Sequence, residues 1–158
     1  MSFSNEFLCD FKPVYEGILA AKGIKPERAV VEVIDEEQEG AGMFEPAGAL
    51  EVLEQIGDDV NTLTIYTDRA AYFWEFVETM YEKNGLVSLI VSKKHLGLAK
   101  KTVGCSSIFL FDFEWDGAFY EKQIALGKHY IPIHKRAWRT AENPVSYTHL
   151  TLPTILRV

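Results

Sequence analysis

Three aspartates stand where short runs of β-branched and aromatic residues end: Asp35, Asp68 and Asp112. In an open α/β sheet, ligands bind outside the carboxyl ends of the strands, at the point where the strand order reverses. Carboxylates gathered there are hard oxygen ligands for Mg²⁺, and bound Mg²⁺ supports phosphoryl transfer and hydrolysis. Glu114 extends this candidate metal set, because alternate acids from Asp112 to Asp116 could present oxygens to one cation. The alternative is that these acids are ordinary helix caps and loop residues, which are common just after strands.

A glycine-containing loop follows the first predicted strand. Its Gly40 and Gly42 resemble the start of a dinucleotide-binding fingerprint, in which Asp68 would bind the ribose of a nicotinamide or flavin dinucleotide. The pattern departs from the fingerprint, because Glu45 stands in place of the third glycine. Several further glutamates in this loop would repel a pyrophosphate. The alternative is a flexible acidic loop that binds nothing.

Basic and hydroxyl side chains follow two other predicted strands. Arg69 comes just after the second strand, and Ser92 and Lys93 come just after the third. At the carboxyl edge of a sheet, such groups could bind a phosphate or a carboxylate. Together with Asp35, Gly40, Gly42 and Asp68 they form the candidate ligand-binding set. Solvated surface is the alternative for each of them.

The elements that would position these residues follow from hydrophobic periodicity. Residues 61–92 read as strand, helix and strand, because two β-branched runs flank a segment with helical period. Thr67 or Asp68 is expected to cap this helix. The predicted strands are 29–34, 63–67, 86–91, 106–111 and 130–133, and the predicted helices lie within 13–22, 46–56, 68–83 and 95–102.

This alternation predicts an α/β fold. The expected form is a Rossmann-like, doubly wound, mostly parallel sheet of about four or five strands with helices on both faces. Strands 63–67 and 86–91 are apolar nearly throughout, which predicts that both of their faces are covered. Pro132 cannot donate a backbone hydrogen bond, so the last strand is expected at a sheet edge.

Composition excludes several classes of protein. The chain has 158 residues and a net charge of −7, which argues against a general nucleic-acid binder. No apolar run is long enough to cross a membrane, and the first residues lack a basic segment followed by an apolar one, so neither a membrane span nor a signal peptide is expected. Cys9 and Cys105 are far apart in the sequence, which predicts two reduced thiols and a cytoplasmic location.

The last residues do not look like protein sequence. Residues 145–154 resemble the translation of a transposon-end adapter used in sequencing libraries, and the following residues fit its index and constant bases. Residues 144–158 are therefore expected to be a non-native tail. Residues 1–143 are expected to form a single α/β domain that is truncated at its C-terminus.

No motif specifies a reaction. The leading hypothesis is a cytoplasmic Rossmann-like module that binds a small anionic or nucleotide-like ligand at the carboxyl ends of its strands. This hypothesis rests on fold analogy alone. One alternative is a Mg²⁺-dependent phosphotransferase or hydrolase that uses the strand-end aspartates. Another is a non-catalytic protein-interaction domain, which would be favoured by an exposed apolar patch away from the strand ends.

Overall fold

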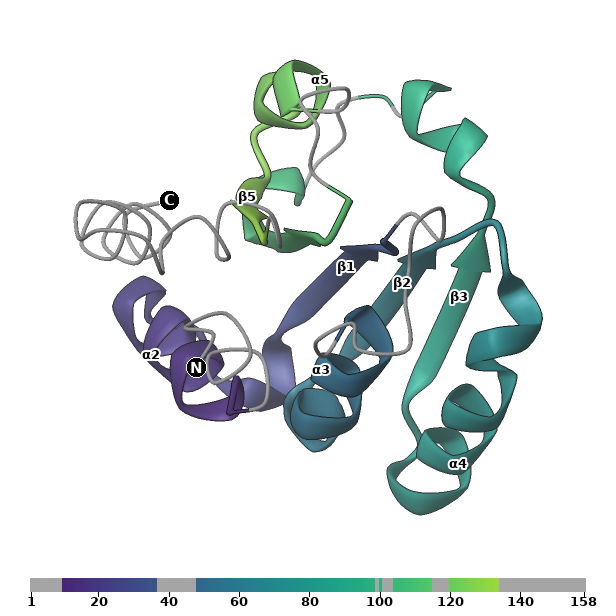
Figure 1. The fold of residues 1–158 in the computed structure, drawn as a ribbon. Helices are drawn as coiled ribbons and strands as arrows, with labels where there is room; N and C mark the ends of the chain where they lie inside the picture. The colour runs from purple at the N-terminus through teal and green to yellow at the C-terminus, as the bar shows by residue number, and fades with distance from the viewer. Residues whose placement is uncertain (1–9, 37–47, 99, 101–103, 115–119, 134–158) are drawn as a thin grey trace, which may run out of the picture.

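The computed structural model describes residues 10–36, 48–98, 100, 104–114 and 120–133. Five strands form one sheet in the order β3-β2-β1-β4-β5, and every neighbouring pair is parallel (Figure 1). The strands are β1 (Val30–Ile34), β2 (Thr62–Tyr66), β3 (Val87–Val91), β4 (Ile108–Asp112) and β5 (His129–Pro132). The predicted Rossmann-like α/β fold is confirmed, and so is the position of the last strand at an edge.

The order of the strands reverses next to β1. The chain moves outward from β1 to β2 and β3, and then returns to the other side of β1 to form β4 and β5. Ile34 at the end of β1 is in register with Tyr66 of β2 and with Asp112 of β4. The carboxyl ends of these three strands therefore lie at one level, and the reversal between β1 and β4 is where this architecture binds ligands.

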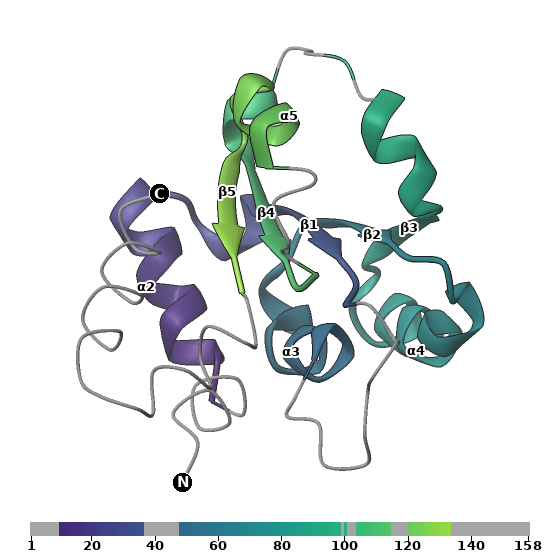
Figure 2. The same cartoon turned by 45° about the horizontal axis from the view of Figure 1, so that its top comes forward.

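Helices lie on both faces of the sheet. One face is covered by α2 (Lys12–Lys22), α3 (Ala49–Ile56) and α4 (Trp74–Asn84), whereas the opposite face carries η4 (Lys93–Leu98) and α5 (Tyr120–Ala125) (Figure 2). The remaining described elements are short 3-10 turns: η1 (Pro26–Arg28), η2 (Gly57–Asp59), η3 (Ala70–Phe73) and η5 (Cys105–Ser107). Helix α2 ends at Gly23 and α4 at Gly85, both with left-handed backbone, as a glycine stop requires.

Alternating strand residues divide the core in two. The larger cluster lies beneath α2, α3 and α4 and takes one set of alternating strand residues: Val31, Val33, Leu63, Ile65, Phe109 and Phe111. The smaller cluster lies on the opposite face and consists of Ile34, Tyr66, Leu96, Leu110 and Tyr130. Both sets are fully or nearly fully buried, which agrees with a parallel sheet that is covered at its centre.

Two predictions about the 61–92 unit are wrong in detail. The helix expected from Asp68 starts as the 3-10 turn η3 and becomes α-helical at Trp74, and no side chain caps it. Strand β3 is not covered on both faces, because Val87 and Leu89 are 56% and 61% exposed. The cause is the position of β3 at the sheet edge, where η4 and α5 leave these two side chains uncovered.

Some predictions fall outside the described residues. These are the loop with Gly40 and Gly42, Cys9, and the non-native tail 144–158. Among the described helices, none has the length and apolar composition needed to cross a membrane.

Candidate functional site

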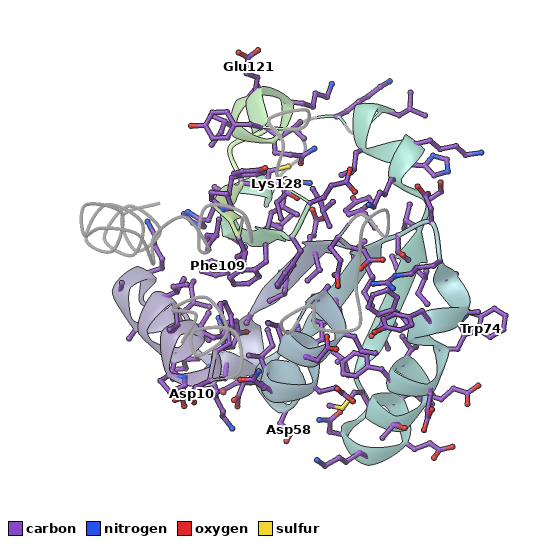
Figure 3. The ribbon with its side chains drawn as sticks, viewed as in Figure 1. Asp10, Asp58, Trp74, Phe109, Glu121 and Lys128 are labelled. Carbon is purple, nitrogen blue, oxygen red and sulfur yellow. The ribbon has the colours of Figure 1, made fainter. Side chains whose placement is uncertain are left out.

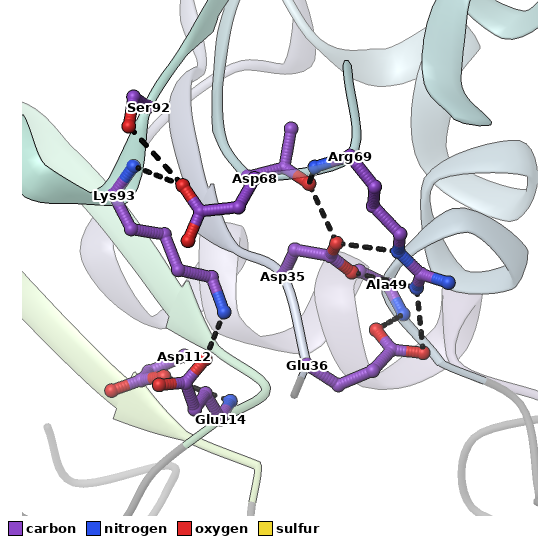
Figure 4. A network of polar contacts seen from close by, with 10 residues as sticks. Asp35, Glu36, Ala49, Asp68, Arg69, Ser92, Lys93, Asp112 and Glu114 are labelled. Carbon is purple, nitrogen blue, oxygen red and sulfur yellow. Dashed lines mark hydrogen bonds and ion pairs between the residues drawn. The ribbon is translucent and has the colours of Figure 1, made fainter. Parts of the chain in front are cut away.

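The carboxyl edge of the sheet carries a polar network, shown in Figure 4. It contains every described residue of the two predicted site sets, together with two residues that sequence reasoning did not select, Glu36 and Thr67. We call it the strand-end network: Asp35, Glu36, Thr67, Asp68, Arg69, Ser92, Lys93, Asp112 and Glu114. Each residue lies at or within a few positions of a strand end, which explains why residues far apart in the sequence meet here.

Asp35 is buried at the centre of this network. Its carboxylate is 1% exposed and accepts hydrogen bonds from Arg69 Nε at 2.8 Å, from Arg69 Nη2 at 3.0 Å and from Thr67 Oγ1 at 2.7 Å. Burial alone would raise the pKa of Asp35, but the hydrogen bonds and charge of Arg69, aided by hydrogen bonds with Glu36 and Thr67, hold that pKa below its usual value. Asp35 therefore ties the end of β1 to the residues that follow β2.

Arg69 is fully engaged by protein groups. Besides its two bonds to Asp35, its Nη2 lies 3.4 Å from Glu36 Oε2, and its guanidinium stacks 3.9 Å from the ring centre of Tyr72. Hydrogen bonding to Asp35 is the main cause that raises the pKa of Arg69. Glu36 in turn accepts the backbone N–H of Ala49 at 2.9 Å, at the start of α3. Arg69 is thus a structural clamp, and its charge is already balanced.

Asp68 differs from Asp35 because only part of its carboxylate is used. Its Oδ1 accepts Ser92 Oγ at 3.1 Å and the Lys93 backbone N–H at 3.2 Å. Its Oδ2 has no partner among the described residues, and the side chain is exposed. The two donors from the end of β3 fix the orientation of the carboxylate, so its second oxygen is an acceptor held in a defined position at the end of β2.

At the end of β4, the acidic side chains are bound by neighbouring protein groups. Asp112 is 1% exposed, accepts the backbone N–H of Glu114 at 3.0 Å through Oδ1, and accepts the Tyr130 hydroxyl through Oδ2. Lys93 Nζ forms an ion pair with Glu114 Oε2. Lys93 and Glu114 bring the end of β3 and the end of β4 together across the face of β1 and β2.

The predicted metal ligands are divided between these contacts. Asp35 is bound by Arg69 and Thr67, Asp112 by Tyr130, and Glu114 by Lys93. Within the described ranges, no three acidic, histidine or cysteine side chains are grouped closely enough to hold a metal ion. The Mg²⁺ hypothesis stays a prediction, and the described residues offer no set of ligands for the ion.

The charge of the network limits its chemistry. Among its described residues are five carboxyl groups, on Asp35, Glu36, Asp68, Asp112 and Glu114, and two basic side chains. Both basic groups, Arg69 and Lys93, are already paired with these carboxylates. Such an edge favours ligand groups that donate hydrogen bonds, such as hydroxyls and amines, over anionic groups.

One cavity of about 350 Å³ lies away from this edge. Gly23, Ile24, Lys25 and Arg28 line it, between the end of α2 and the start of β1, whereas Asp35 follows the opposite end of β1. The cavity and the strand-end network therefore lie at opposite ends of β1 and are separate sites.

Sequence reasoning could have found Glu36 and Thr67. Both directly adjoin selected aspartates in the sequence, Glu36 after Asp35 and Thr67 before Asp68. The contact between Tyr130 and Asp112 carried no such signal, because it depends on β4 and β5 being neighbours.

Comparison with known proteins adds no relative: no protein-family model, no curated protein and no solved structure matches this chain. The class is therefore defined by the fold itself, an α/β domain with a Rossmann-like parallel sheet and a polar network at its carboxyl edge.

Proposed function

We propose that this domain binds a small nucleoside-like ligand at the carboxyl edge of its sheet, with Asp68 as the acceptor for a sugar hydroxyl pair. The observation that carries the proposal is the state of the Asp68 carboxylate. Oδ1 accepts hydrogen bonds from Ser92 and Lys93, while Oδ2 has no partner among the described residues and the side chain is exposed. An acid at the end of the second strand is where Rossmann-type sheets bind ribose hydroxyls.

The charge of the edge supports a ligand that donates hydrogen bonds. An anionic group placed here would lie beside the exposed Asp68 carboxylate, and Arg69 and Lys93 are already paired with acidic side chains. Of the two ligand types predicted from the sequence, the nucleotide-like one is favoured. The described residues would recognise its sugar and not its phosphate.

A direct test is Asp68→Asn. Asparagine keeps an oxygen that can accept from Ser92 and Lys93, but it replaces the second acceptor, Oδ2, by an NH₂ donor. The variant should therefore fold normally and lose only the hydrogen bond from Oδ2 to the ligand. Asp10→Asn is the matched control, because Asp10 is also exposed and lies far from the sheet edge (Figure 3).

The ligands to test are the four common ribonucleosides and their 2′,3′-dideoxy analogues, with binding measured by titration calorimetry. We expect at least one ribonucleoside to bind and its dideoxy analogue to bind about tenfold more weakly or worse, the effect of losing hydrogen bonds to a charged group. Asp68→Asn should weaken the ribonucleoside similarly and Asp10→Asn should not. Equal affinity for the ribose and dideoxy forms would contradict the proposal, as would the absence of binding by all four.

We also propose a cytoplasmic location. It is supported by the sequence, in which the two cysteines, Cys9 and Cys105, lie far apart and form no CxxC pair.

A further inference from the structure

Strand β3 is an edge strand without the usual protection. It pairs with β2 on one side, and no described strand pairs with its other side. Its sequence, Val-Ser-Leu-Ile-Val, contains no charge and no proline. Edge strands normally carry such residues, or a bulge or covering helix, because their open backbone groups invite pairing with another chain.

The backbone groups that face outward can be identified. The Thr67 N–H donates to the Val91 carbonyl at 2.8 Å, so Val91 points its backbone toward β2. Because successive residues of a strand alternate in direction, Val87 and Leu89 also point toward β2. Ser88 and Ile90 therefore direct their N–H and carbonyl groups to the open side.

Large apolar side chains flank this open edge on both faces of the sheet. On one face Val87 and Leu89 are 56% and 61% exposed. On the other face, Trp74 and Tyr81 of α4 are 59% and 62% exposed and lie two helical turns apart on the same flank of that helix. Trp74 points away from the body of the molecule on the side where β3 lies (Figure 3).

The helix that borders the edge is acidic. Glu78 lies on the same flank of α4 as the two aromatic residues, and Glu75 and Glu82 are exposed nearby. Lys83 is turned to the other side, where it lies 3.4 Å from Asp58. A side chain approaching β3 from the α4 face therefore meets two aromatic rings and the carboxylate of Glu78, which forms no ion pair with any described residue, and this suits a guanidinium group.

We propose that β3 receives an extended segment of another protein by strand addition, and that this segment alternates arginine with aliphatic residues. Ser88 and Ile90 supply the backbone hydrogen bonds. The arginines face Trp74, Tyr81 and Glu78, and the aliphatic residues cover Val87 and Leu89. A second copy of this chain is a poor occupant, because it carries a net charge of −7 and would bring its own acidic α4 against Glu78.

The test uses a fluorescent seven-residue peptide that alternates arginine with valine and leucine, and measures its binding by anisotropy. Control peptides replace arginine by glutamate, or replace the central residue by proline to block strand pairing. The protein variants are Glu78→Lys and Trp74→Ala. Glu54→Lys is the control, since Glu54 is an exposed glutamate on α3 that makes the same charge change away from β3.

We expect the arginine peptide alone to bind. Glu78→Lys should raise its Kd about tenfold and Trp74→Ala about three- to fivefold, whereas Glu54→Lys should change it less than about twofold. Amide exchange should slow at Ser88 and Ile90 and not at Val87 and Leu89. Binding of the proline peptide with equal affinity, insensitivity to Glu78→Lys, or a dimer of the protein that occupies β3 would each overturn the proposal. None of these outcomes depends on nucleoside binding at Asp68.

Discussion

Removal of the Arg69 guanidinium tests whether its ion pair with Asp35 stabilises the carboxyl edge of the sheet. In Arg69→Met the aliphatic stem remains, but the buried Asp35 carboxylate loses both hydrogen bonds from the guanidinium and keeps the Thr67 hydroxyl as a donor. Breaking a buried ion pair from one side costs about 3–5 kcal/mol, because an uncompensated charge stays buried. Arg69 is 22% exposed, so we expect the lower end of this range, about 3 kcal/mol.

The pH dependence gives this prediction a distinctive signature. The pKa of Asp35 is lowered in the folded state relative to its ordinary value of 3.8. A lowered pKa contributes stability that is present above the unfolded pKa and is lost as the pH falls through the folded pKa. The difference in unfolding free energy between the original chain and Arg69→Met should therefore be largest near neutral pH and should shrink below about pH 4.

Urea unfolding followed by circular dichroism, at pH values from about 7 down to 3, measures this difference. Near pH 7 the melting temperature should also fall by about 10 °C for a domain of this size. Arg28→Met is the matched control, because Arg28 is exposed and has no ion pair among the described residues. If Arg69→Met lost less than about 0.5 kcal/mol, or lost the same amount at every pH, the reasoning would be refuted.

Two further predictions concern buried groups on the face of the sheet that carries η4 and α5. Burial, and secondarily the charge of Glu32, raises the pKa of Tyr66 to about 12, so stability should fall as the pH rises from 10 toward 12. Tyr66→Phe should lessen that alkaline loss in chemical unfolding at matched pH values; an unchanged alkaline profile would argue against it. The Lys128 ammonium lies 2.6 Å from Glu32 with both side chains largely buried, so Lys128→Met should cost about 3 kcal/mol. Adding Glu32→Leu should recover most of that loss, and a double variant as unstable as the single one would show that the pair is not the cause.

The periodicity of the sequence predicted the fold because local pattern and tertiary environment agree over most of the chain. Apart from Glu32, residues 30–34 and 108–111 are apolar, and β1 and β4 are central and buried. The same apolar pattern in residues 86–91 was misleading. Strand order is a tertiary property, and the order in this sheet places β3 at an edge with two of its apolar side chains exposed.

The location of the candidate site followed from the sequence, whereas the roles of its residues did not. Parallel strands in register bring their carboxyl ends to one level, which predicts that Asp35, Asp68 and Asp112 meet at one edge. Only the geometry separates Asp35 and Asp112, whose oxygens are bound within the protein, from Asp68, whose Oδ2 has no partner among the described residues. From the sequence, Arg69 is likewise predicted to bind an anionic ligand, but in the structure it forms ion pairs with Asp35 and Glu36.

The most direct test of the proposed ligand site is a titration of the ¹⁵N-labelled chain with the ribonucleosides, followed by NMR. The Lys93 amide donates to Asp68, so its resonance should move with the ribonucleoside that binds and should not move with the dideoxy analogue. Shifts confined to the cavity between Gly23 and Arg28, or shifts at Lys93 that are the same for both forms, would contradict recognition of a sugar hydroxyl pair by Asp68.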